Sequence, residues 1–95
     1  MLNPIFVAID TPDLEAARKL AVNLSEHIGG IKVGLEFFCT NGVAGVLELS
    51  KLGTPIFLDL KFHDIPNTVA GALRGAMTAH PSILNVHATG GEEMM

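Results

Sequence analysis

Two charged residues, Asp59 and Lys61, interrupt an apolar stretch near the middle of the sequence. The stretch from Ile56 to Leu60 is otherwise typical of a strand whose two faces are both covered, as in a parallel sheet under helices. Because side chains alternate along a strand, Asp59 and Lys61 are predicted to point the same way. A carboxylate and an ammonium in such a poorly solvated position must be paired. The ammonium could stabilise negative charge that develops on a substrate and then donate a proton to it.

A second carboxylate follows in the loop after this strand. Asp64 lies three residues beyond Lys61. Pro66 then fixes the backbone for a helix start, where Asn67 and Thr68 offer side-chain oxygens to the free N–H groups. For the strand-end pair taken alone, a purely structural ion pair is an equally good interpretation, because buried pairs perturb pKa values without catalysing anything.

The composition indicates a folded chain that does not bind nucleic acid. Its 95 residues are 48% hydrophobic and 17% charged, which suits one hydrophobic core. The formal net charge is −4, and the six Lys and Arg residues are spread along the chain, so the basic stripe of a nucleic-acid-binding surface is missing. No apolar run approaches the ~20 residues of a membrane span, so no membrane association is expected.

The cysteine content and the N-terminal sequence predict a cytoplasmic protein. Cys39 is the single cysteine, which excludes an internal disulfide and suits a reducing compartment. The first residues lack a basic region, and Asp10 ends the apolar stretch early, so no signal peptide is expected.

Apolar strands and amphipathic helices are predicted to alternate along the whole chain. The expected strands are 5–9, 31–35, 56–60 and 83–88, and the expected helices are 12–28, 41–52, 66–80 and the opening of one at 90–95. Thr11 is predicted to be the N-cap of the first helix, and Gly53 to end the second. This alternation requires a parallel sheet with right-handed crossovers, and it indicates one domain over 1–95.

Polar residues recur at the carboxyl ends of the expected strands. They are Asp10, Lys32, the pair Asp59 and Lys61, and His87. Ligands of α/β folds bind at these ends, so the pattern predicts a functional site there. Each residue also has a simpler interpretation, since Asp10 could be a helix cap, Lys32 could extend to solvent from a sheet edge, and His87 could be a hydrogen-bonded core histidine.

The longer sequence around the charged strand end resembles a known signature. Asp-Leu-Lys-Phe-His-Asp-Ile-Pro-Asn-Thr at 59–68 is similar to the signature of the orotidine 5'-phosphate decarboxylase family, whose enzymes make UMP. The opening strand that ends in Asp10, the strand with Lys32-Val-Gly, and the strand with Asn85-Val-His-Ala also lie where this family has them. The resemblance implies a (β/α)8 TIM-type barrel, a homodimer, and decarboxylation of orotidine 5'-phosphate without a metal or cofactor.

The resemblance assigns roles to the polar strand-end residues of this chain. Asp10 would contact the ribose of the substrate, and Lys32 would belong to a charged array. Asp59 would lie next to the carboxylate that leaves, and Lys61 would donate the proton that replaces it.

The resemblance also assigns roles to residues in the loop and helix that follow. Asp64 and Thr68 would reach across the dimer interface into the partner's active site, and Ile65 would line the pyrimidine pocket. The charges of Lys32, Asp59, Lys61 and Asp64 sum to zero, which would make it tolerable to bury them together.

The length of the chain predicts only about the first four βα units, which is half of such a barrel. A closed barrel of this type needs about 200–250 residues, and the loops that would close over the base and bind phosphate belong to its later units. The first and last strands would have unpaired edges that invite association. We therefore expect little or no activity from the 95-residue chain alone, either as a truncated copy or fragment or as a half barrel that self-association completes.

Two other functions remain open from the sequence. Related barrels that act on sugar phosphates, as decarboxylases or synthases, share an Asp-x-Lys-x-x-Asp strand end and use a metal, although His63 and the residues 65–68 favour the orotidylate enzyme. The chain could instead be a half barrel without catalytic activity that serves as an interaction module. A magnesium requirement would favour the first alternative, and a defined complex with a second-half polypeptide would favour the second.

Overall fold

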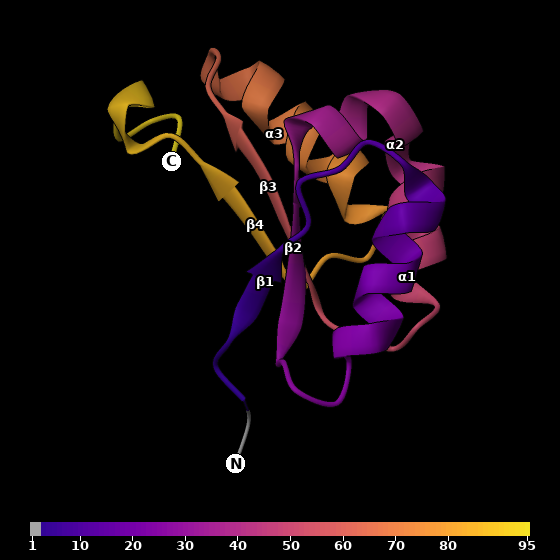
Figure 1. Ribbon diagram of the computed structural model, residues 1–95. Helices are drawn as coiled ribbons and strands as arrows, with labels where there is room; N and C mark the ends of the chain where they lie inside the picture. The colour runs from indigo at the N-terminus through magenta and orange to yellow at the C-terminus, as the bar shows by residue number, and fades with distance from the viewer. Residues whose placement is uncertain (1–2) are drawn as a thin grey trace.

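A computed structural model describes residues 3–95 and shows parallel strands that alternate with helices (Figure 1). The elements are β1 (Phe6–Ala8), α1 (Leu14–Leu24), β2 (Gly30–Gly34), α2 (Leu35–Ser50), β3 (Ile56–Phe62), α3 (Pro66–Met77), β4 (Ile83–Val86) and the 3-10 turn η1 (Ala88–Gly90). The strands lie in the order β1-β2-β3-β4, and every neighbouring pair is parallel. The predicted four-strand half barrel is confirmed.

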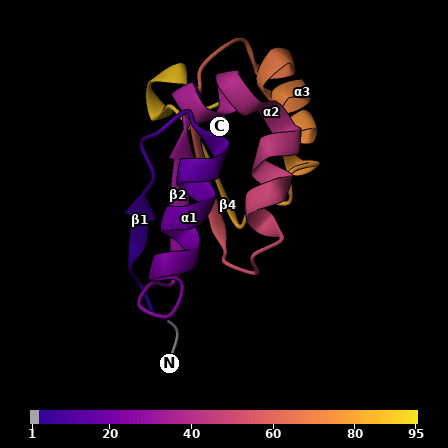
Figure 2. The same ribbon diagram turned by 45° about the vertical axis from the view of Figure 1, so that its right-hand side comes forward.

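The three α-helices cover one face of the sheet, in the order α1, α2, α3 (Figures 1 and 2). The strand residues that face them are fully buried and include Ile31, Val33, Ile56 and Leu58. These residues lie side by side because of the strand register, in which Ile31 is opposite Ile56 and Val33 is opposite Leu58. None of the helices within residues 3–95 is long and apolar enough to cross a membrane.

The opposite face of the sheet carries the intervening side chains, and none of the α-helices of residues 3–95 lies over it in either view (Figures 1 and 2). One register row on this face runs through Ala8, Lys32, Phe57 and Ile83. Ala8 is exposed, and Ile83 is 42% exposed. In a closed barrel this face becomes the interior, where side chains from alternate strands form layers.

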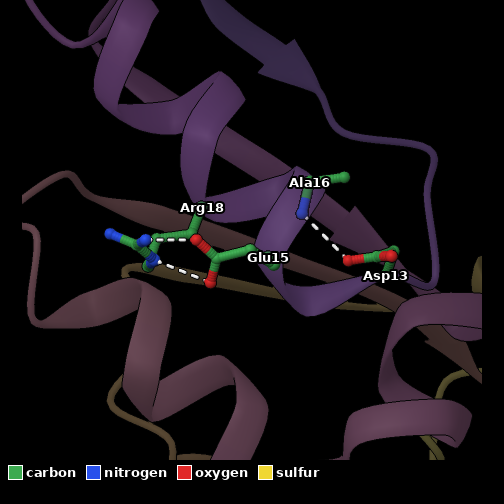
Figure 3. Close-up of polar contacts among 4 residues, drawn as sticks. All are labelled: Asp13, Glu15, Ala16 and Arg18. Carbon is green, nitrogen blue, oxygen red and sulfur yellow. Dashed lines mark hydrogen bonds and ion pairs between the residues drawn. The ribbon is translucent and has the colours of Figure 1, made fainter.

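The first helix begins two residues later than the sequence predicted. Asp13, not Thr11, is the N-cap, and its Oδ1 accepts a hydrogen bond of 3.0 Å from the backbone N–H of Ala16 (Figure 3). The Oγ1 of Thr11 instead accepts a hydrogen bond from the N–H of Asp13 and so orders the approach to the helix. Both residue types can cap a helix, and the extended backbone at Asp13 decides between them.

The second helix follows β2 without a loop. The sequence predicted a strand to residue 35 and a helix over 41–52, but α2 begins at Leu35 with Gly34 in extended conformation before it. Gly42 has a φ of +65° and kinks α2, so the segment after this glycine corresponds to the predicted helix. The helix ends at Ser50, two residues before the predicted end, and Gly53 follows in the turn with a φ of +81°.

The C-terminal segment does not form the predicted helix opening over 90–95. The 3-10 turn Ala88–Gly90 follows β4 instead, and Gly91 has a φ of +99° that interrupts helical geometry. The side chain of Met94 is buried, and its sulfur lies against Gly90, so the segment folds back on itself.

We predict that Asp13→Ala lowers the free energy of unfolding by about 1 kcal/mol, because the N–H of Ala16 loses its acceptor. Chemical denaturation followed by circular dichroism measures this change. Thr11→Ala serves as the control and should cost less. If the two variants lose equal stability, or if Thr11→Ala loses more, the capping role of Asp13 is wrong.

Candidate active site

The pairing between β3 and β4 is irregular where the charged residues lie. Leu58 pairs with Leu84 and Phe62 pairs with Val86, so three residues of β3 lie opposite the single residue Asn85 of β4. This bulge takes Asp59 and Lys61 out of the ladder with β4, although Asp59 still pairs with Gly34 of β2. Bulges of this kind often occur beside active sites, where they redirect side chains.

Asp59 has a partner on each side. Its Oδ1 accepts from the Nζ of Lys61 at 2.8 Å and from the Nδ2 of Asn85 at 2.7 Å, and its Oδ2 pairs with the Nζ of Lys32 at 3.2 Å. The side chain is only 8% exposed, whereas those of Lys32 and Lys61 are 35% and 52% exposed. The predicted pairing of Asp59 with Lys61 and the predicted closeness of Lys32 are therefore observed.

These partners lower the pKa of the Asp59 carboxyl from its ordinary 3.8 to about 2. The hydrogen bond from Lys61 is the largest cause, and the hydrogen bonds from Asn85 and Lys32 add to it, whereas burial acts in the opposite direction. Asp59 is therefore ionised at every physiological pH, although its side chain is almost fully buried.

Lys61 has an unusual backbone conformation. Its φ is +53°, in the left-handed region that residues with a Cβ rarely adopt, and such a residue costs of the order of 1–3 kcal/mol. Its N–H donates a 2.8 Å hydrogen bond to the Oδ1 of Asn85. Strain of this kind persists only where the surrounding structure holds it, and it is frequent at functional sites.

The three charges leave one positive charge in excess. Lys32 and Lys61 share the single carboxylate of Asp59, and no further acidic side chain within residues 3–95 pairs with either lysine. The arrangement therefore offers a half-exposed ammonium, fixed at one end by Asp59, to an anionic group placed on the uncovered face. Such a group can stabilise negative charge and transfer a proton.

Asp64, Ile65 and Thr68 lie outside this cluster. All three side chains are exposed, Ile65 to 65%, and the carboxylate of Asp64 accepts a hydrogen bond from the N–H of Ile65. Within residues 3–95 Asp64 forms no ion pair with either lysine, so the charge balance of the four residues stays a prediction that depends on a partner chain. The side chain of Thr68 caps no backbone N–H of α3.

Asp10 lies at a different part of the same sheet end. It lines a cleft of about 200 Å³ at the carboxyl ends of β1 and β2, together with Thr11, Glu36 and Phe37. Asp10 is exposed and forms no ion pair within residues 3–95. The charged cluster of Lys32, Asp59 and Lys61 does not line this cleft.

Asn85, to which the sequence alone assigned no role, contacts two of the site residues through its amide. The available signal was a polar residue inside the apolar run of β4, next to the charged end of β3. His87, predicted as a strand-end residue, is exposed, and its ring lies 5.5 Å from that of His63. Within residues 3–95, no three His, Cys, Asp or Glu side chains lie close enough to hold a metal ion.

We predict that the loss of stability in acid depends on Asp59. Because the folded pKa is depressed, the unfolded chain binds more protons between pH 3.8 and about 2, so the stabilisation by Asp59 is complete above this window and is lost as the pH falls through it. Denaturant unfolding at a series of pH values measures the change. Asp59→Asn should be less stable at neutral pH and should lose this part of the pH dependence.

The matched variant Asp64→Asn removes the same charge from a carboxylate that contacts neither lysine, and it should keep the parent's loss of stability in that window. An Asp59→Asn chain with the same pH profile as the parent would contradict the ion-pair geometry.

Comparisons with known proteins agree with this geometry. A sequence profile of the Orotidine 5'-phosphate decarboxylase / HUMPS family matches residues 3–95. The orotidine 5'-phosphate decarboxylase of Sphingopyxis alaskensis is 59% identical over 95 residues, which are 100% of this chain and 42% of that protein. The enzyme of the same name from Rhodospirillum rubrum is 60% identical over 94 residues, which are 98% of this chain and 38% of that protein.

A solved structure supports the same relationship. The crystal structure of orotidine 5'-phosphate decarboxylase from Pyrococcus horikoshii superposes with a TM-score of 0.88 at 30% identity, over 95% of this chain and 44% of that one. The chain thus spans less than half the length of these relatives. With a family profile that matches almost every residue, the chain belongs to the Orotidine 5'-phosphate decarboxylase / HUMPS family.

Proposed function

We propose that the protein to which this chain contributes decarboxylates orotidine 5'-phosphate to UMP without a cofactor, and that Lys61 is the proton donor. The observation that carries the proposal is the ammonium of Lys61, held 2.8 Å from a buried, ionised Asp59 on the uncovered face of the sheet. Family membership supports the choice of substrate. The reaction belongs in the cytoplasm, whose reducing conditions suit the free, exposed Cys39.

The proposed step needs fixed positive charge and a proton, and Lys61 supplies both. The bond between C6 of the pyrimidine and the carboxylate breaks, CO2 leaves, and the electron pair stays on C6. No conventional electron sink is available there, so stabilisation must come from fixed charges. The ammonium of Lys61 stabilises the developing carbanion and then transfers its proton to C6, which leaves UMP and a neutral lysine that is reprotonated from water.

Electrostatics from this cluster provides only part of the rate acceleration. One contact between unit charges at 4 Å is worth about 4 kcal/mol at an effective dielectric constant near 20, whereas enzymes lower barriers by roughly 8–23 kcal/mol. Binding energy from remote parts of the substrate, chiefly its phosphate, must supply the rest. We place that phosphate site in later units of the barrel, so the 95-residue chain alone should have little or no activity.

The remaining site residues act at the edges of this cluster in our proposal. Asp10 binds the ribose from the neighbouring cleft, and Lys32 keeps Asp59 ionised beside the departing carboxylate. In a homodimer, the exposed Asp64 and Thr68 reach the partner's site. The surplus positive charge of the cluster supports this arrangement, because a carboxylate from a partner chain would neutralise it.

We predict that Lys61→Ala lowers kcat/KM by about 10³-fold or more, because both charge stabilisation and proton transfer are lost. The assay follows UMP formation by a completed chain, defined as residues 1–95 joined to the unmatched remainder of the Sphingopyxis alaskensis relative. Lys51→Ala is the matched control, since Lys51 pairs with Glu48 on the exposed surface of α2 and should keep full activity. Substantial residual turnover by Lys61→Ala would remove Lys61 from the proton-donor role.

We predict that the completed chain keeps its decarboxylase activity in excess EDTA and gains nothing from added magnesium, because the proposed step uses only the ammonium of Lys61 beside the carboxylate of Asp59. Initial rates with and without each reagent measure this. A requirement for magnesium would point instead to the sugar-phosphate chemistry of related barrels.

A further inference from the structure

We propose that Asn85 is a positioning residue, whose one amide group holds Asp59 and Lys61 in their reactive arrangement by spanning the bulge in β3. This inference rests on the proposed function for its consequence in catalysis, and on the geometry of β3 and β4 for its structural content.

The position of Asn85 is set by strand register. Between the paired residues Leu58–Leu84 and Phe62–Val86, β4 contains Asn85 alone while β3 contains three residues. The backbone of β4 therefore cannot continue the ladder to each of those residues. The side chain of Asn85 takes over part of this function, because its amide forms hydrogen bonds with the first and the third of them.

The two hydrogen bonds of Asn85 have distinct effects. Its Nδ2 donates to the Oδ1 of Asp59 at 2.7 Å, which fixes the carboxylate that also receives the Nζ of Lys61. Its Oδ1 accepts from the backbone N–H of Lys61 at 2.8 Å, and this residue has the left-handed φ of +53°. Only a side chain with a donor and an acceptor about 2 Å apart can serve both at once, and the carboxamide of asparagine has this shape.

The geometry explains why the lysine remains near its carboxylate although it is half exposed. A flexible lysine side chain gains little from one surface ion pair. Here the backbone of Lys61 and the carboxylate of Asp59 are both attached to the same amide, so the pair is preorganised before any substrate arrives. Preorganised charge costs no rearrangement during the reaction, which is the source of its catalytic value.

Substitutions at Asn85 can separate the two hydrogen bonds in the 95-residue chain without any assay of turnover. Asn85→Leu removes both, whereas Asn85→Asp keeps an acceptor for the N–H of Lys61 and replaces the donor to Asp59 with a like charge. Two NMR measurements report on them individually. The pH titration of the Asp59 carboxyl carbon follows the first hydrogen bond, and the exchange rate of the Lys61 amide hydrogen follows the second.

We expect Asn85→Leu to raise the pKa of Asp59 by about 1 and to speed exchange of the Lys61 amide about 10-fold. Asn85→Asp should raise the pKa of Asp59 at least as much and leave the Lys61 amide protected. Asn41→Leu is the control, because Asn41 also uses its amide in two hydrogen bonds, to the carbonyl groups of Pro12 and Phe37. It should change neither quantity.

An unchanged pKa of Asp59 and unchanged exchange at Lys61 in Asn85→Leu would overturn the proposal. Equal changes in Asn41→Leu would also overturn it, since the effect would then be general loss of structure. If Asn85→Leu fails to give a native spectrum, the near-isosteric Asn85→Asp decides alone. Failure of the proposed decarboxylation would leave these results intact, because neither measurement involves substrate.

Discussion

A buried carboxylate needs a hydrogen-bond donor for each of its oxygens. At the end of β3, both oxygens of Asp59 have such donors. Two ammonium groups and one amide surround it, and its pKa falls to about 2 as a result. The donors come from β2, β3 and β4, so the charged group lies where neighbouring parallel strands end. Removal of any one donor would leave part of the burial cost uncompensated. The ion pair and the sheet therefore stabilise each other.

The charged cluster lies on the face of the sheet that none of the α-helices within residues 3–95 covers, so its lysines are accessible from that side. The helices fill one side with apolar contacts, while Lys32 and Lys61 project on the other side with one positive charge in excess. In the proposed function, an anionic substrate would approach there, and a carboxylate from a second chain would balance the charge. The same face and the free edges of β1 and β4 are also the parts that a complete barrel would cover.

Much of the fold followed from simple patterns, whereas the details of the site did not. Apolar runs that end in polar residues predicted the strands. The alternation of side chains along a strand predicted that Asp59 and Lys61 point the same way. The start of α2 was missed because Leu35 and the residues after it suit a strand and a helix equally well. Asn85 was missed because its contact with Asp59, 26 residues away, depends on a register shift that no local pattern encodes.

A double-mutant cycle between Lys32 and Asp59 tests whether the neighbouring strand holds the buried carboxylate, because it measures the interaction across the strands and not the cost of either change alone. The variants Lys32→Met, Asp59→Asn and their combination are unfolded by denaturant at neutral pH. We expect a coupling free energy of about 1 kcal/mol in favour of the pair. If the two single effects add to within about 0.3 kcal/mol, the two side chains do not interact, and the ion pair does not hold Asp59 in place.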